Sequence, residues 1–187
     1  MNILLVTILT LIISRQKMKK RVPKSSEYPI YRYSTIINNR KISRDIIKRP
    51  DIAAIIAIEK GQFILEQQNR FPNGNVIEIP SGHLKKGEKP MQCAFREFKE
   101  ETGYEAKKMT PLLTFYPLIG YTTQKVHCFV ATGIRNTGMQ KLDKDEFLHV
   151  VKINIKDAIK LIQSEQIVDS ISVCAILYYI FKKRLQI

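Results

Sequence analysis

Short apolar runs separated by turn residues recur along most of the chain. Runs of roughly four to eight residues rich in Ile, Val, Tyr and Phe are typical of β-strands. The Asn-Asn pair at 38–39 and the Lys-Gly pair at 60–61 predict hairpin turns. In the run at 125–132, both alternating sets of positions are apolar, which predicts a strand buried on both faces. The predicted strands are 31–37, 41–48, 52–58, 63–68, 76–79, 112–116, 125–132 and 150–155.

In three segments the apolar residues recur at the spacing of a helix. Apolar residues recur at helical spacing from Met91 to Phe98, Pro90 suits the first turn, and Gly103 is a C-terminal stop. Two further helices are expected at about 157–164 and 170–183. Strands before and after one helix, followed by two terminal helices, predict the α/β class, as a sandwich with a mixed sheet. The expected packing face of the last helix consists of Ile171, Cys174, Leu177, Tyr178 and Phe181.

Three glutamates crowd one side of the helix that begins near Pro90. At about 3.6 residues per turn, Glu97 and Glu101 stand one above the other, and Glu100 lies beside them. Like charges at this spacing repel, and a divalent cation would replace that repulsion by coordination. Oxygen ligands on a rigid element suit Mg²⁺ or Mn²⁺. Taken alone, a solvated acidic helix face explains these glutamates equally well.

The residues around the three glutamates form a spaced pattern from Gly82 to Tyr104. Five residues separate Gly82 from Glu88, seven more precede Arg96, and the run REFKEETGY follows. This pattern resembles the Nudix box at every fixed position, and the chain is identified by it as similar to Nudix hydrolases. The resemblance implies a Nudix-type α/β/α sandwich with a mixed sheet. It also implies hydrolysis of a nucleoside diphosphate linked to another group.

The resemblance carries specific roles to residues of the box. Arg96 and Glu88 are similar to a pair that braces the loop against the helix, which makes Arg96 part of the expected catalytic site. The cofactor implied is Mg²⁺, with Mn²⁺ as an alternative. The implied metal ligands are Glu97, Glu100, Glu101 and the backbone carbonyl of Ser81.

Hydrolysis also requires a base that takes the proton of the attacking water. In the resembled group this base can come from a later loop, which here offers Asp143, Asp145 and Glu146. We favour Glu146, and Glu100 is the competing candidate. Arg70 is the expected substrate-binding residue, because a guanidinium binds phosphate oxygens in a bidentate manner. A simple surface role explains Glu146 and Arg70 nearly as well.

Outside the box, the resemblance extends from about residue 39 to residue 181 and indicates ADP-ribose pyrophosphatases and related nucleotide-sugar hydrolases. It rests on stretches such as LEQQNRFPNGNVIEIPSG and FYPLIGYTT. The chain departs from that subgroup at Ile119, where a proline is usual, and at Thr123 and Gln124, where an acidic pair is frequent. We expect metal-dependent hydrolysis of the pyrophosphate bond of a nucleoside diphosphate sugar such as ADP-ribose. The products would be a nucleoside monophosphate and a sugar phosphate.

Two alternative functions stay open. One is a pyrophosphohydrolase acting on RNA 5′ ends or dinucleoside polyphosphates, which the formal net charge of +14 allows. No aromatic and basic RNA-binding motif supports it. The other is a non-catalytic nucleotide-sensing module on the same fold. The intact set of three glutamates argues against a sensor, which has no need of adjacent repelling carboxylates.

Length and composition limit the organisation of the chain. A chain of 187 residues can bury a sizeable core. We expect residues 29–187 to form the Nudix hydrolase domain. Residues 1–28 are expected to be an apolar and then basic N-terminal extension, flexible or not part of the functional chain.

Charge and cysteine content bear on partners and compartment. The lysines are scattered, so we expect a small-molecule nucleotide substrate and no nucleic-acid partner. The apolar run at 3–13 is shorter than the roughly 20 residues that span a bilayer, so we expect no membrane partner. The three cysteines form no Cys-x-x-Cys pair, which fits a reduced cytoplasm. A homodimer is expected from the resemblance and because it is the commonest closed assembly.

Overall fold

The computed structural model describes residues 14–21, 28–142 and 147–184. The chain forms two compact units. The first unit comprises residues 1–49 and 118–123, and the second comprises residues 50–117 and 124–187. In the part of the chain that the structure describes, no helix has the length and apolar content required to cross a membrane.

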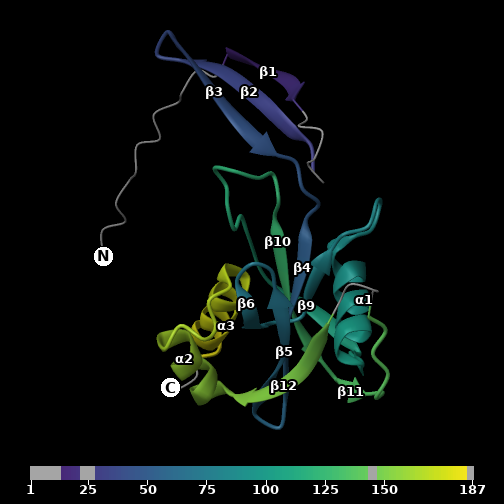
Figure 1. Cartoon of the computed structure of the whole chain (residues 1–187). Helices are drawn as coiled ribbons and strands as arrows, with labels where there is room; N and C mark the ends of the chain where they lie inside the picture. Colours follow the sequence, from purple (N-terminus) through teal and green to yellow (C-terminus); the bar gives the residue numbers. More distant parts are fainter. Residues whose placement is uncertain (1–13, 22–27, 143–146, 185–187) are drawn as a thin grey trace, which may run out of the picture. The chain divides into compact units, whose positions relative to one another are not determined.

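The second unit is built on a mixed sheet (Figure 1). Its central strand β4 (Ile52–Glu59) pairs in parallel with β10 (Val126–Thr132), whereas the other pairings are antiparallel. The strand order is β12-β5-β4-β10-β9, with β6 added to β5 and β7 added to β4. The remaining strands of this sheet are β5 (Gln62–Arg70), β6 (Gly74–Glu78), β7 (Ser81–His83), β9 (Lys108–Phe115) and β12 (Leu148–Asn154). A separate short ladder joins β8 (Tyr104–Glu105) to β11 (Arg135–Asn136).

Helices cover both faces of this sheet (Figure 1). One face packs on α1 (Pro90–Thr102), and the other packs on α2 (Ile155–Gln163) and α3 (Ser170–Lys183). Alternate residues of β4 divide between the two layers, because successive side chains of a strand point to opposite faces. Ala53, Ile55 and Ala57 lie in the α1 core, whereas Ile52, Ala54 and Ile56 lie in the other core. The predicted α/β/α sandwich with a mixed sheet is confirmed.

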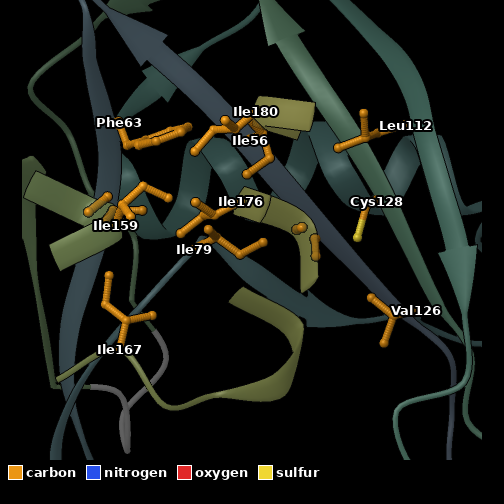
Figure 2. Packing of buried hydrophobic residues seen from close by; sticks show 14 of the residues in the cluster. Ile56, Phe63, Ile79, Leu112, Val126, Cys128, Ile159, Ile167, Ile176 and Ile180 are labelled. Carbon is orange, nitrogen blue, oxygen red and sulfur yellow. The ribbon is translucent and has the colours of Figure 1, made fainter. Parts of the chain in front are cut away.

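The core on the α2 and α3 side contains large aliphatic side chains from both helices and the sheet (Figure 2). Ile176 and Ile180 of α3 pack with Ile56 and Phe63, and Ile159 comes from α2. The packing face predicted for α3 is wrong, because Cys174, Leu177, Tyr178 and Phe181 are exposed. The buried residues of α3 are Ser172, Ala175, Ile176 and Ile180.

The first unit contains a three-stranded antiparallel sheet in the order β1-β2-β3. Strands β2 (Ile30–Ile37) and β3 (Arg40–Ile47) form the predicted hairpin around 38–39. Strand β1 (Ser14–Arg21) pairs with β2. The sequence analysis did not predict β1. Within the same unit, the Ile47 amide donates to the Tyr121 carbonyl over 2.8 Å, so the 118–123 segment is hydrogen-bonded to the end of β3. The division between extension and domain at residue 28 stays a prediction.

Candidate active site

The site is assembled by the chain that leads from β6 through β7 into α1. Gly103 ends this helix in a left-handed conformation, with φ of 69°, and its amide donates to the Lys99 carbonyl. At Gly82 the helix approaches the loop so closely that a Cβ atom there would lie 2.1 Å from the Glu97 carboxylate carbon. Only glycine fits this contact without displacing Glu97, which gives the first box position its physical reason.

Arg96 connects the loop before the helix to two glutamates of the helix. Its Nε and Nη2 each donate to one Glu88 carboxylate oxygen over 2.8 Å, in a bidentate pair. Its Nη2 also donates to the His83 carbonyl over 3.2 Å. Its Nη1 lies 2.6 Å from Glu97 Oε1 and 3.1 Å from Glu100 Oε2. The brace between Arg96 and Glu88 that the resemblance implied is therefore present.

The ionisation of this cluster follows from the same contacts. Hydrogen bonds from Arg96 are the main reason that the pKa of Glu88 falls to about 2, although burial opposes the shift. Hydrogen bonding to Glu88, together with Glu97 and Glu100, raises the pKa of Arg96 despite its burial. Burial is the main cause that raises the pKa of the Cys93 thiol to about 12, and the nearby Glu97 charge adds to it. Cys93 is therefore a neutral neighbour of Glu97, with Sγ 3.9 Å from Oε1.

Glu97 and Glu101 are buried, with residue exposures of 8% and 4%. The Ser81 amide donates to Glu101 Oε2 over 3.0 Å, so the backbone of Ser81 lies beside that carboxylate. Ser81 therefore lies beside Glu101, whereas Glu97 and Glu100 both contact Arg96. Within the described residues, however, no group of three His, Cys, Asp or Glu side chains is arranged closely enough to hold a metal ion.

Carboxylate and carbonyl oxygens are nevertheless the kind of ligand that hard divalent cations prefer. Arg96 occupies oxygens of Glu97 and Glu100, and the Ser81 amide occupies one oxygen of Glu101. In this structure the three carboxylates therefore make hydrogen bonds and ion pairs with the protein, and they do not converge on one point. The missing Cβ at Gly82 lets the Glu97 carboxylate lie directly against this loop.

Arg70 lies at the end of β5 and pairs with Glu78 of β6. Its Nη2 donates to Glu78 Oε2 over 2.8 Å, and its Nε lies 3.2 Å and 3.1 Å from the two Glu78 oxygens. Burial lowers the pKa of Arg70, but the hydrogen bonds and charge of Glu78 outweigh it, with Glu101 and Asp169 adding to the net rise. The Arg70 side chain keeps 49% exposure whereas Glu78 keeps 8%, so a buried carboxylate anchors a solvent-facing guanidinium.

A buried contact from α3 fixes the strand that enters the site. The Ile79 amide donates to Ser172 Oγ over 2.9 Å, and Ser172 Oγ donates to Asp169 Oδ2 over 2.9 Å. Asp169 is also the N-cap of α3, because its carboxylate accepts from the Ser172 amide. This hydrogen-bonded chain holds the backbone two residues before Ser81. The sequence reasoning missed Glu78, Ser172 and Asp169, although a charged residue directly before Ile-Pro-Ser-Gly was a signal for Glu78.

Two other predictions concern loops. Glu146, the favoured base, lies outside the described residues. Ile119 in the first unit is 73% exposed. Gln124 in the second unit is buried, and its amide donates to the Pro50 carbonyl over 2.8 Å. Gln124 thus fastens the chain just before β4.

Comparison with protein families decides the class of this site. The NUDIX domain model matches residues 47–169, well over half of the chain. The chain belongs to the Nudix family and is a Nudix hydrolase. The matched residues contain the whole loop, brace and helix described above, including the close contact between Gly82 and Glu97.

Relatives and a solved structure agree with this family. The chain is 38% identical over 152 residues to an ADP-ribose pyrophosphatase of Bacillus subtilis, covering 80% of this chain and 82% of that protein. It is 35% identical over 144 residues to a methanol dehydrogenase activator of Bacillus methanolicus, covering 75% and 78%. A crystal structure of an ADP compounds hydrolase superposes with a TM-score of 0.78 at 18% identity, covering 94% and 98%, and so shows the Nudix fold.

Proposed function

We propose that the chain hydrolyses the pyrophosphate bond of nucleoside diphosphate sugars, with ADP-ribose among its substrates. The observation that carries this proposal is the Arg96 brace, which joins Glu88, Glu97 and Glu100 beside the buried Glu101. The similarity to an ADP-ribose pyrophosphatase over 80% of the chain supports the substrate class. Water adds to one phosphorus, the bridging P–O bond breaks, and a nucleoside monophosphate and a sugar phosphate leave.

The divalent cation that Nudix hydrolases generally require would be Mg²⁺ or Mn²⁺ in this proposal. The residues that would hold it are Glu97, Glu100, Glu101 and the carbonyl of Ser81. The chemistry that such a cation supplies when bound is neutralisation of the diphosphate charge and acidification of the attacking water. Burial of Glu97 and Glu101 strengthens their attraction for a cation, because a low effective dielectric raises Coulomb energies.

Each remaining residue has a task defined by its contacts. Arg96 fixes the loop by its bidentate pair with Glu88 and contacts Glu97 and Glu100 through Nη1. Arg70 presents an exposed guanidinium edge to phosphate oxygens, and Glu78 holds that guanidinium in place. Because Glu78 accepts from Nε and Nη2, the orientation of the Arg70 side chain is set before substrate arrives.

The base that removes the proton of water is Glu146 in this proposal, with Glu100 as the competitor. Glu100 has a side-chain exposure of 31%, compared with 10% for Glu97, so solvent reaches Glu100 more easily. It also accepts from Arg96 over 3.1 Å, so it lies within the same cluster as the proposed ligands. Its exposure and its place in this cluster make Glu100 the competing candidate.

A substrate panel tests the proposal. ADP-ribose, other nucleoside diphosphate sugars, a dinucleoside polyphosphate and a triphosphorylated RNA are each incubated with the protein and Mg²⁺, and the products are identified by mass. Hydrolysis of ADP-ribose to AMP and ribose phosphate, abolished by a chelator, is expected. In ¹⁸O-labelled water the label should enter a phosphate product and not the anomeric carbon. Turnover of the RNA end alone would replace the proposal by the first alternative, and turnover of none would favour a sensor.

Two further parts of the proposal concern assembly and compartment. A homodimer is proposed from the family resemblance, with the segment from residue 31 to residue 48 at its interface. A cytoplasmic location fits the free thiols of Cys93, Cys128 and Cys174, because reducing compartments keep cysteines unpaired. Fractionation of cells and measurement of the molar mass in solution test these two parts.

A further inference from the structure

A segment that lies far from the box in the sequence covers the C-terminal end of α1. We call residues 137–141 the strap. The Lys141 amide donates to the Glu100 carbonyl over 2.8 Å, and Nε2 of Gln140 donates to the Glu101 carbonyl over 2.5 Å. The last carbonyls of a helix have no partner within the helix, so other groups must bond them. The strap supplies these partners at the two residues on the last turn of α1 that are proposed as metal ligands.

The strap also packs closely against Gly103, which ends the helix. The Thr137 amide and Oγ1 donate to the Gly103 carbonyl over 2.8 Å and 2.7 Å. A Cβ atom at Gly103 would lie 3.2 Å from the backbone N and C atoms of Met139, which is closer than most Cβ contacts in proteins. Any other residue at position 103 would therefore push against the strap, in addition to the strain of a φ of 69°. The end of the helix and the strap are thus packed backbone against backbone.

The start of the strap is itself held in place. Strand β11 leads into the strap and pairs with β8, which follows the end of α1. Across this ladder, Arg135 Nη2 lies 2.9 Å from Glu105 Oε2. At the turn into the strap, the Gly138 amide donates to Asn136 Oδ1 over 2.7 Å. The stretch of chain that leaves α1 therefore also holds the start of the strap, so the strap and the last turn form one hydrogen-bonded unit.

The last turn of α1 carries two of the three proposed ligand side chains. Glu100 accepts from Arg96 Nη1 over 3.1 Å, and Glu101 accepts from the Ser81 amide over 3.0 Å. Helix ends fray, whereas Glu97 lies one turn earlier, inside the helix. The positions of Glu100 and Glu101 therefore depend on the groups that hold the end of α1, and the position of Glu97 depends on them much less.

We propose that Gln140 is a positioning residue of the active site, because its side-chain amide fixes the last turn of α1 and thereby holds Glu100 and Glu101 in place for a cation. This inference rests on the proposed function, whose metal ligands it concerns. Gln140 acts through the Glu101 carbonyl. Lys141 reaches Glu100 through a backbone amide, which every residue except proline offers, so the Gln140 side chain is the part of this contact that the sequence determines. Groups that hold a metal ligand in place typically change metal affinity or activity by about 10-fold to 100-fold.

Direct cation binding tests this role without relying on catalysis. The variant Gln140→Leu removes the amide donor at nearly the same side-chain size. Titration of the full chain with Mn²⁺, followed by electron paramagnetic resonance, should give an affinity about tenfold or more below that of the wild type. The matched control Gln163→Leu makes the same change at an exposed glutamine that ends α2, and should leave the Mn²⁺ affinity unchanged.

The same variant has an expected signature in hydrolysis. ADP-ribose hydrolysis by Gln140→Leu should need a correspondingly higher Mg²⁺ concentration for half-maximal rate. At saturating Mg²⁺ the rate should return towards the wild-type value, because a higher cation concentration compensates for a lower affinity. A general loss of folded protein would instead lower the rate equally at every Mg²⁺ concentration.

Hydrogen–deuterium exchange locates the effect in the helix. In the metal-free protein, residues 99–104 should exchange faster in Gln140→Leu than in the wild type, and residues 90–95 should exchange at the same rate. Equal Mn²⁺ affinity of the two proteins overturns the proposal even where exchange is faster, because the strap would then only stabilise the fold. Absence of Mn²⁺ binding by the wild type overturns it too. If Gln140→Leu does not fold, Gln140→Asn takes its place, since its amide is one methylene shorter and should likewise bind Mn²⁺ more weakly.

Failure of this inference differs from failure of the proposed function. If the wild type hydrolyses no member of the substrate panel but Gln140→Leu binds Mn²⁺ more weakly, the proposed function fails and Gln140 keeps its positioning role. If the wild type hydrolyses ADP-ribose and the Mn²⁺ titrations of the two proteins coincide, only the role of Gln140 fails.

Discussion

At the scale of single residues, Arg96 decides the state of the active site before any cation binds. Its guanidinium contacts three glutamates, of which Glu88 is a partner in the loop and the other two are proposed ligands. Arg96 contacts oxygens of Glu97 and Glu100, whereas Glu101 Oε2 accepts from the Ser81 amide. This difference makes Glu101 the best residue with which to test the metal site.

Glu101→Gln should reduce hydrolysis by roughly 100-fold or more, since even loss of a residue that supports a metal ligand costs up to this amount. The glutamine oxygen can still accept from the Ser81 amide, so the fold should be retained. Mg²⁺ should raise the melting temperature of the wild type, because a ligand stabilises the state that binds it, and should raise that of the variant much less. Full activity in the variant would refute the metal site.

Glu88→Gln tests the brace through the pH dependence of stability. The folded-state pKa of Glu88 is lowered from 4.5 to about 2. Its ionised form therefore stabilises the fold above about pH 4.5, and this contribution is lost as the pH falls towards 2. Wild type should be more stable than the variant near neutral pH, by on the order of 1–3 kcal/mol for hydrogen bonds to a charged group. Urea unfolding at several pH values should show this difference shrinking between pH 4.5 and 2.

The two candidate bases are separated by matched variants. Glu146→Gln should lower kcat by about 100-fold to 10,000-fold with KM nearly unchanged, because a base acts mainly in the transition state. Glu100→Gln should instead raise the Mg²⁺ concentration needed for half-maximal rate. If Glu146→Gln keeps wild-type turnover across the pH range and Glu100→Gln loses the acidic limb of the profile, Glu100 is the base.

At the scale of elements, α3 acts on the active site from the opposite side of the sheet. Ser172 is fully buried and holds the Ile79 amide, which precedes Pro80 and Ser81. The sequence separation is 93 residues, so this contact forms only in the folded sheet and helix layers. The N-terminus of α3 thereby positions the backbone that offers a carbonyl to the proposed metal.

Ser172→Ala should destabilise the protein by about 1–3 kcal/mol, because the buried Ile79 amide loses its acceptor. Ser170→Ala is the matched control, since Ser170 is exposed two residues earlier on the same helix and should change stability by less than about 0.5 kcal/mol. Denaturant unfolding of both variants measures the difference. Equal stability of the two variants would show that the α3 contact does not hold the strand.

The sequence predicted the elements whose pattern of apolar residues, turn residues and helix ends lies within the element itself. The strongly periodic box helix ends at Gly103 as expected, and the doubly buried β4 and β10 stand at the centre of the sheet. The face of α3 was predicted wrongly because apolar residues surround that helix, so periodicity alone could not select the side. Glu78 and Ser172 were missed because their partners, Arg70 and Ile79, are brought to them by tertiary packing.

At the scale of the whole molecule, the proposed homodimer predicts the molar mass in solution. Light scattering after size exclusion at micromolar concentration should give about twice the mass of the 21.7 kDa chain. Asp45 pairs with Arg32 on the proposed interface segment. The charge reversal Asp45→Lys should therefore weaken the dimer, so that the measured molar mass falls towards that of one chain. A fully active species at monomer mass would contradict the family resemblance on this point.

The parallel pairing of β4 with β10 also has a consequence for synthesis of the chain. Ile52 pairs with Val126, so 74 residues must leave the ribosome after β4 begins before its parallel partner starts to appear. During that interval one edge of the most apolar strand is uncovered, and non-local pairing of this kind is slow and exposed to aggregation. The α3 layer, which buries the same strand, emerges later still. Nascent chains stalled before residue 126 should therefore be the species that chaperones hold, and release should follow the appearance of α3.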